Sequence, residues 1–245
     1  MAAGTVSPYL TGRFCDALRA VTPLRHVIRV ARNWGEDVLD ALLNIRTRTR
    51  PGTTPPASRF GDAVAFSHLD YAVIRTVMRA VPVSRDDVFV DVGCGKGRLL
   101  CLFARRPLKK CIGIEIDRDL ARIAAANARS LRGRRCPIEI VTGDAVDADY
   151  SEATVIWFGN PFGQRTMRHV AERIRASLIA APRRVRIIHF RTVYDPQPDF
   201  HALFAPEEIR DVSAWYNSSV GTLLELRAPA PRLVATSLAR AAGGN

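Results

Sequence analysis

The chain has 245 residues, of which 47% are hydrophobic and 24% are charged, a composition typical of a soluble α/β domain with an extension. It holds no run of about 18 apolar residues, which argues against a transmembrane helix. The formal net charge is +12. Because the basic residues are scattered along the chain, this charge does not by itself indicate a nucleic-acid partner.

The five cysteines form no CxxC pair and are odd in number, a pattern that predicts neither a zinc site nor a disulfide framework. We therefore expect reduced and mostly buried thiols, no bound metal and a cytoplasmic location. The arginine-rich N-terminus has the character of a transit peptide, but Asp16 and two prolines interrupt it, so a folded or partner-binding extension is favoured.

The first part of the chain, residues 1–60, is predicted to be a helical arm followed by a linker. Apolar residues recur at roughly helical spacing up to about residue 48. The segment Thr47–Ser58 then holds three prolines and several threonines, which is typical of a loop. A further helix is predicted over Ser67–Val81, where Pro82 closes it.

After Pro82, strand-like and helix-like segments alternate. The predicted strands are Val88–Val92, Cys111–Ile116, Pro137–Val141, Thr154–Phe158, Val185–Phe190, Ile209–Trp215 and Gly221–Leu226. The predicted helices are Arg98–Arg106, Asp119–Leu131 and Arg165–Ala181. This order predicts βαβ units in a mainly parallel sheet that ends in an antiparallel pair. This α/β domain is predicted to span residues 61–230. Residues 231–245 are predicted to form a flexible tail.

A glycine-rich turn, with the sequence Val90-Asp91-Val92-Gly93-Cys94-Gly95-Lys96-Gly97, follows the first predicted strand. It matches neither the G-x-G-x-x-G spacing of dinucleotide-binding folds nor a P-loop. Glycines at such a turn let the backbone approach a ligand, and open α/β sheets bind ligands at this edge. Glu115 ends the second strand about 20 residues later, where a carboxylate can accept both hydroxyl protons of a ribose.

Together, these segments resemble class I S-adenosylmethionine-dependent methyltransferases. The glycine-rich turn resembles the first motif of the family, and Gly113-Ile114-Glu115 resembles its second-strand acid. Gly143-Asp144-Ala145 resembles the element that meets the adenine, and Asn160-Pro161-Phe162 resembles the (Asp/Asn)-Pro-Pro-(Tyr/Phe) element. The resemblance covers about residues 87–226. It implies a seven-stranded, mostly parallel Rossmann-like methyltransferase sheet with helices on both faces, plus the N-terminal helical extension.

The resemblance implies S-adenosylmethionine as the cofactor. It places Asp91 near the amino-acid portion of this cofactor, Glu115 near the ribose and Asp144 near the adenine amine. The helix before the first motif often borders the cofactor in the family, so Tyr71 is a candidate contact as well, with packing in the core as the alternative interpretation. The other predicted cofactor contacts are Gly93, Cys94, Gly95, Gly97, Ile116, Ala145 and Asn160.

The resemblance also indicates the acceptor side of the site, with Asn160, Pro161 and Phe162 as predicted catalytic residues. In the family, an acid or amide followed by proline goes with transfer to nitrogen. A side-chain carbonyl can orient an amine, and an aromatic ring can pack on a planar or cationic substrate. One proline stands here rather than two, so a plain turn is the alternative interpretation. His68 and His189 are candidate general bases.

We predict that the chain transfers a methyl group to a nitrogen of a protein side chain, of the lysine type. One alternative is a small-molecule methyltransferase of secondary metabolism or envelope synthesis, with the N-terminal arm as a lid. A nucleic-acid N-methyltransferase is a second, but the chain has no recognisable target-recognition domain and only 7% aromatic residues for base stacking. A non-catalytic cofactor-binding protein is the third. The oligomeric state is left open.

Overall fold

The computed structural model describes residues 34–48, 57–67, 69–190, 209–211 and 222–226. Its helices are α2 (Tyr71–Ala80), α3 (Arg98–Phe103), α4 (Arg118–Ser130) and α5 (Gln164–Ala180), and residues 34–43 are also helical. Its strands are β1 (Val88–Val92), β2 (Lys110–Glu115), β3 (Ile138–Thr142), β4 (Val155–Phe158), β5 (Val185–His189), β6 (Ile209–Asp211) and β7 (Thr222–Leu226). Among these described helices, none is both long enough and apolar enough to cross a membrane.

The strands form one sheet in the order β3-β2-β1-β4-β5-β7-β6. Strands β1 to β5 pair in parallel, whereas β7 pairs antiparallel with both β5 and β6. The predicted α/β architecture, with a mainly parallel sheet and a final antiparallel pair, is confirmed. The described part of β6 ends at Asp211, because the rest of the predicted strand lies outside the described residues.

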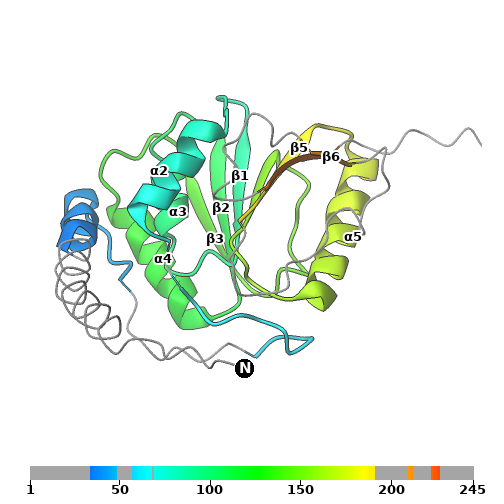
Figure 1. Ribbon diagram of the computed structural model, residues 1–245, viewed down its shortest axis with the longest axis horizontal. Helices are drawn as coiled ribbons and strands as arrows, with labels where there is room; N and C mark the ends of the chain where they lie inside the picture. Colours follow the sequence, from blue (N-terminus) through cyan, green and yellow to red (C-terminus); the bar gives the residue numbers. More distant parts are fainter. Residues whose placement is uncertain (1–33, 49–56, 68, 191–208, 212–221, 227–245) are drawn as a thin grey trace, which may run out of the picture.

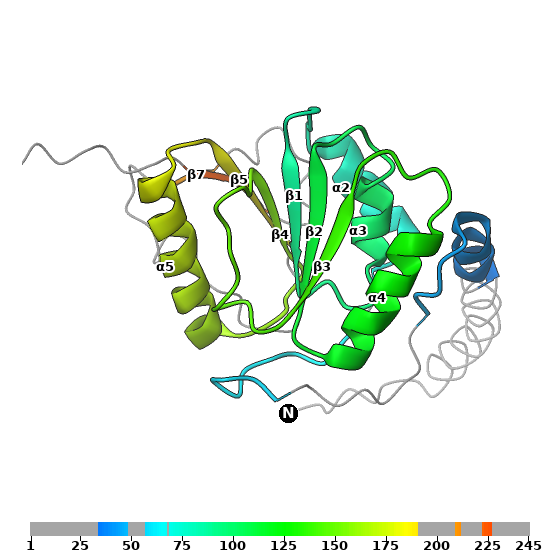
Figure 2. The ribbon, with the colours of Figure 1, turned by 180° about the vertical axis from the view of Figure 1, so that it is seen from behind.

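Helices cover both faces of the sheet. Helices α2, α3 and α4 lie against one face and α5 lies against the other, as the two opposite views show (Figures 1 and 2). Each face has its own apolar core. In β1, Val88, Val90 and Val92 belong to the core on the α5 side, and Phe89 stacks on Phe103 of α3 in the other core. Strand β1 is therefore buried on both faces, as its continuous apolar run predicts.

The position of the site follows from the strand order. From β1 the chain proceeds through β2 to β3 on one side of the sheet, and then crosses to β4 and β5 on the other side. The loops after β1 and β4 therefore diverge at a topological switch point, where open α/β sheets leave a crevice at the carboxyl ends of their strands. The predicted cofactor turn follows β1, and the Asn160-Pro161-Phe162 element follows β4.

The described part of the N-terminal arm packs on the outer side of the α2–α3–α4 layer (Figure 1). Leu43 and Ile45 are buried in the core on that side. The side chain of Asn44 donates to the carbonyl of Ser130, and the hydroxyl of Ser130 donates back to the carbonyl of Asn44. Residues 34–48 are thus joined to the domain. The predictions for residues 1–33, the linker within 49–56, the tail after 226 and His68 lie outside the described residues.

Candidate functional site

A cleft with an empty volume of about 720 Å³ lies at the carboxyl edge of the sheet. Its walls come from the loops after β1, β2, β3 and β4, from the start of α4 and α5, and from the segment before α2. The predicted site residues in its wall are Gly93, Glu115, Ile116, Asp144, Ala145, Asn160, Pro161 and Phe162. The fold therefore brings together, in one cleft, residues that are up to 69 positions apart in the sequence.

The glycine turn is tied to the end of β2 by hydrogen bonds. The backbone N–H groups of Gly93 and Cys94 both donate to the carbonyl of Ile114, at 2.9 and 3.0 Å. The N–H of Gly95 donates to one carboxylate oxygen of Glu115 at 2.7 Å, and the N–H of Asp117 donates to the other at 2.9 Å. A carboxylate offers about four acceptor sites, so Glu115 can both hold the turn and accept a hydroxyl from a ligand.

The pKa values of two buried carboxyl groups in this region, those of Asp91 and Glu115, are raised. Burial, and to a lesser extent the charge of Glu115, raise the pKa of Asp91 to about 8. Burial also raises the pKa of Glu115, although the N–H groups of Asp117 and Gly95 partly oppose this shift. Asp91 is therefore protonated at neutral pH until a positively charged group approaches it.

Asp91 faces a second hollow, which adjoins the cleft. This hollow has an empty volume of about 420 Å³ and is lined by Asp91, Cys94 and Arg98 together with apolar side chains. It shares four lining residues with the cleft: Phe66, Ser67, Gly93 and Gly159. The two hollows together provide one recess beside Glu115 and another beside Asp91.

The segment Asn160–Phe162 forms the wall of the cleft after β4. Asn160 has a φ of 61°, a left-handed conformation that asparagine tolerates better than most residues. The carbonyl of Pro161 accepts the N–H of Val64 at 3.0 Å, and Phe162 forms an isolated antiparallel bridge with Ala63. The left-handed backbone gives Asn160 a structural reason to be asparagine, in addition to any role of its side chain.

The segment Ala63–Ser67 is part of the cleft wall, which the sequence analysis did not predict. It runs along the carboxyl edge of the sheet before α2 (cyan in Figure 1). The ring of Phe66 covers Gly95, because a Cβ built on Gly95 would lie 2.2 Å from that ring. An aromatic residue ahead of a helix carries no recognisable spacing, so its long-range contact with the glycine turn was not evident in the sequence.

Two of the predicted cofactor contacts, Gly95 and Gly97, also pack closely against neighbouring residues. Gly95 lies beneath Phe66 and donates to Glu115. Gly97, the N-cap residue of α3, has a φ of 76°, and a Cβ there would lie 3.3 Å from that of Ala124 in α4. Neither glycine is among the residues that line the two hollows. Their small size lets the turn pack closely against its neighbours.

Tyr71 corrects a prediction. Its side chain is buried on the α2 side, and its hydroxyl donates to Asp40 at 2.5 Å. Tyr71 lines neither hollow, so it packs within the domain rather than in the cleft. Burial and the hydrogen bond to Asp40 raise the pKa of Tyr71 well above its usual value. His189 is also buried, at the end of β5, and it is absent from the lining of both hollows.

The residues of the cleft fit the cofactor that the sequence implies. Glu115 presents a buried carboxylate at the end of β2, and Gly143 opens directly into space, since a Cβ there would meet no atom within 4 Å. Asp144 lies beside Gly143 and accepts the N–H of Val146 at 3.1 Å, which leaves its second oxygen for a ligand amine. These groups match the hydroxyl and amine donors of an adenosine.

Part of the chain is similar to known methyltransferases. Residues 89–180 match the family model described as a methyltransferase domain. Two curated relatives match part of the chain. A protein-lysine N-methyltransferase of Saccharolobus islandicus is 38% identical over 85 residues, which are 34% of this chain and 52% of the relative. A histone-lysine N-methyltransferase of Drosophila melanogaster, specific for lysine 79 of histone H3, is 29% identical over 121 residues, which are 44% of this chain and 6% of the relative.

The chain thus spans about half the length of the first curated relative and a small part of the second. Solved structures similar to the chain include an RNA methyltransferase from Salinibacter ruber in complex with S-adenosyl-L-homocysteine. It is 26% identical with a TM-score of 0.44, and the match covers 67% of this chain and 94% of that chain. A TehB-like S-adenosylmethionine-dependent methyltransferase from Corynebacterium glutamicum has 17% identity, a TM-score of 0.47, and coverage of 64% and 88%.

Proposed function

We propose that this chain, whose residues 89–180 form an S-adenosylmethionine-dependent methyltransferase domain, transfers a methyl group to a lysine side-chain nitrogen of a protein. The domain and its cofactor are those expected from the sequence. The lysine acceptor is supported by the position of Asn160, which lies in the same cleft as Glu115 and is followed by the aromatic ring of Phe162. Both curated relatives described above carry names of lysine methyltransferases.

The proposed chemistry needs orientation more than acid–base catalysis. S-adenosylmethionine supplies a methyl group on a positively charged sulfur, which is a strongly activated leaving group. Glu115 and Asp144 would hold the adenosine part, and Asp91 would face the amino-acid part. Once the lysine ammonium has lost a proton to water, the side-chain carbonyl of Asn160 would accept an N–H of the resulting amine and turn its lone pair toward the methyl group. Phe162 would pack on the apolar stem of the lysine.

The test is a transfer assay with S-adenosylmethionine that carries a radioactive methyl group, incubated with a soluble cell extract. We expect label in protein that protease removes and nuclease leaves in place, and we expect Nε-methyllysine after acid hydrolysis. Label confined to small molecules or to nuclease-sensitive material would contradict the lysine proposal. The first of these outcomes would indicate a small-molecule acceptor, and the second would indicate a nucleic-acid acceptor.

Replacement of Asn160 separates the two roles of that residue. Asn160→Gly keeps a residue that adopts a φ of 61° without strain but removes the side-chain carbonyl. We expect Asn160→Gly to bind S-adenosylhomocysteine like the wild type and to lose roughly 10²-fold in transfer rate, as expected for a lost orienting contact. Full transfer by Asn160→Gly would mean that Asn160 serves only the turn, and the acceptor role proposed for it would be wrong.

A further inference from the structure

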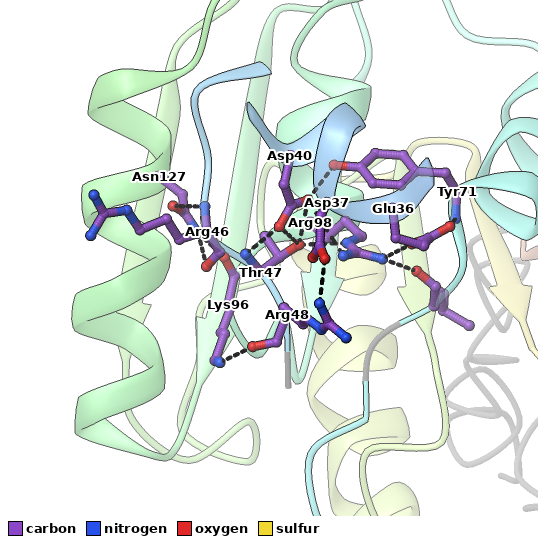
Figure 3. A network of polar contacts seen from close by, with 11 residues as sticks. Glu36, Asp37, Asp40, Arg46, Thr47, Arg48, Tyr71, Lys96, Arg98 and Asn127 are labelled. Atoms are coloured by element: carbon purple, nitrogen blue, oxygen red, sulfur yellow. Dashed lines mark hydrogen bonds and ion pairs between the residues drawn. The ribbon is translucent and has the colours of Figure 1, made fainter. Parts of the chain in front are cut away.

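The described N-terminal segment meets the cofactor turn through a buried polar network (Figure 3). Arg98, the first residue of α3, follows directly after the glycine turn and lines the second hollow beside Asp91. Its guanidinium is buried and pairs with the carboxylates of Glu36 and Asp40. Charges this deeply buried need several partners to offset the loss of water, so the network has a strict geometry.

Every side of the Arg98 guanidinium has a partner. Nε donates to the hydroxyl of Thr47 at 2.5 Å, and Nη1 donates to Glu36 and, at 3.1 Å, to the carbonyl of Leu69. Nη2 lies 3.4 Å from Asp40, and the ring of Tyr71 stacks on the guanidinium at 4.5 Å. The planar donor fork of arginine is thus held in one orientation, which lysine could not reproduce.

Asp40 is the centre of this network. Its two oxygens accept the N–H of Thr47 at 2.7 Å, the hydroxyl of Thr47 and the hydroxyl of Tyr71. Glu36 serves a second purpose, because it accepts the N–H of Tyr71, the first residue of α2, at 3.0 Å. The side chain of Asp70, at the cap position of α2, makes no such bond. The segment therefore connects the beginnings of α2 and α3.

A second group of contacts reaches the glycine turn itself. The side-chain amide of Asn127 in α4 donates to the carbonyl of Lys96 at 2.8 Å and to that of Arg46 at 3.2 Å, and its oxygen accepts the N–H of Arg46 at 2.8 Å. The ammonium of Lys96 donates to the carbonyl of Arg48 at 2.6 Å. Residues 46–48 and the turn are thus held to each other and to α4 (Figure 3).

From these contacts we propose that residues 36–48 contribute to cofactor binding. They hold Arg98, a positioning residue that fixes the wall of the second hollow around Asp91. None of residues 36–48 lines either hollow, and the segment reaches the second hollow through Arg98, which lines that hollow and not the cleft. Its influence falls on the second hollow, which would take the amino-acid end of the cofactor. The proposal rests on the S-adenosylmethionine-binding role of the domain, and it is independent of the methyl acceptor.

The test compares two ligands of the purified full chain by isothermal titration. S-adenosylhomocysteine has the amino-acid end, and adenosine lacks it. The variants are Arg98→Lys, which keeps the charge but loses the donor fork, and Thr47→Val, which replaces the hydroxyl with a methyl group of similar size. We expect both to weaken S-adenosylhomocysteine by about tenfold, the scale of a lost hydrogen bond to a charged group, while the affinity for adenosine changes by less than about twofold.

Arg183→Lys is the matched control. Arg183 is a half-buried arginine whose guanidinium donates to the carbonyls of Ala153, Tyr150 and Ser177, just before β4 and late in α5, away from the cleft. We expect Arg183→Lys to lower the thermal midpoint without changing the ratio of the two affinities. Arg98→Lys and Thr47→Val should change the ratio of the affinities for S-adenosylhomocysteine and adenosine. The titrations are done at a temperature where circular dichroism shows that both variants are folded.

Equal losses of both affinities in Arg98→Lys and Thr47→Val, or no loss in either folded variant, would overturn the proposal, because the segment would then support only the fold. If the wild type itself failed to bind S-adenosylhomocysteine, the cofactor assignment would be at fault instead. A wild type that binds this ligand but methylates no protein would contradict the lysine proposal alone, so the failures are distinguishable.

Discussion

The protonation state of the Asp91 carboxyl depends strongly on its surroundings. Burial and the nearby Glu115 raise its pKa to about 8, so it is protonated in the free protein at neutral pH. If it receives the ammonium of the cofactor, it must ionise, and a proton is released when the ligand binds. The free energy of binding then contains the cost of this ionisation, which decreases as the pH rises.

A pH series tests this coupling. Between pH 6 and 7.5 we expect the affinity for S-adenosylhomocysteine to rise with pH, by at most about tenfold per unit for one released proton. Adenosine, which has no ammonium, should bind without this trend, and Asp91→Asn should abolish it. The measurement is titration calorimetry in buffers of different ionisation enthalpy, which also counts the proton released. A flat profile for S-adenosylhomocysteine would show that Asp91 does not meet the ammonium.

Glu115 combines two functions in one carboxylate. It accepts the N–H of Gly95 and of Asp117, and it lines the cleft. We expect Glu115→Gln to weaken adenosine and S-adenosylhomocysteine alike, by about 1–3 kcal/mol, because the hydrogen bonds to a charged acceptor are lost on the ribose side of the site. Calorimetric titration of both ligands checks this. A loss confined to S-adenosylhomocysteine would place Glu115 at the wrong end of the cofactor.

At the scale of the elements, the glycine turn after β1 is restricted by its neighbours as well as by its backbone. Gly93 has a φ of 73°, and a Cβ there would lie 2.5 Å from the Cβ of Pro161. Gly61 has a similar φ of 68°, but a Cβ there would meet nothing within 4 Å. The two glycines therefore separate the cost of a left-handed backbone from the cost of a collision.

We expect Gly61→Ala to lower the free energy of unfolding by about 1–2 kcal/mol, the cost of a left-handed residue with a Cβ. Gly93→Ala should lose clearly more, because the new methyl group must also push the Asn160–Phe162 wall outward. Urea denaturation of the two variants measures the difference. Equal losses would mean that the wall yields freely, and the close contact between the β1 and β4 loops would have no energetic consequence.

Helix α5 begins with a cap that comes from a distant part of the chain. The carboxylate of Asp62 accepts the N–H and the hydroxyl of Thr166, and the carbonyl of Asp62 accepts the N–H of Gly163 at 2.9 Å. This carboxylate replaces the N-cap side chain that Gly163 cannot supply. The segment before α2 is thus fastened to the loop that carries the proposed acceptor residues.

Asp62→Ala should therefore lower the free energy of unfolding by about 0.5–2 kcal/mol, as for other lost helix caps. Asp62→Asn keeps an acceptor oxygen and should restore most of this loss. Asp147→Ala is the control, since Asp147 forms an exposed ion pair with Arg59 that contributes little. Thermal unfolding of the three variants compares them. An unchanged midpoint in Asp62→Ala would show that the cap has no role in stability.

At the scale of the whole molecule, the net charge of +12 is the feature that the proposed function leaves unused. A basic surface binds nucleic acid through phosphate contacts, and such binding weakens steeply with salt. We expect any binding to random RNA to fall by orders of magnitude between 50 and 200 mM salt, with no methyl transfer to the RNA. Filter binding at several salt concentrations checks the first point. Transfer to RNA that persists at the higher salt would favour a nucleic-acid acceptor.

Much of the fold could be predicted from the sequence because its signals are local. Apolar runs such as Val88–Val92 and the helical spacing of the segments between strands recur within a few residues. The turn after β1 and the acid Glu115 carry a recognisable spacing, so the position of the cofactor cleft followed from them. Asn160 was singled out by the resemblance of Asn160-Pro161-Phe162 to the (Asp/Asn)-Pro-Pro-(Tyr/Phe) element.

The sequence by itself determined the order of strands and helices, the mainly parallel sheet and the glycine turn with Glu115 that we expect to hold the adenosine part. Only the tertiary structure decided that Tyr71 turns toward Asp40, that Phe66 covers Gly95 and that residues 36–48 hold Arg98. These contacts join residues from 29 to 62 positions apart and involve common residue types with no fixed spacing. Their geometry exists only after the helices have packed on the sheet, and periodicity within one segment cannot encode it.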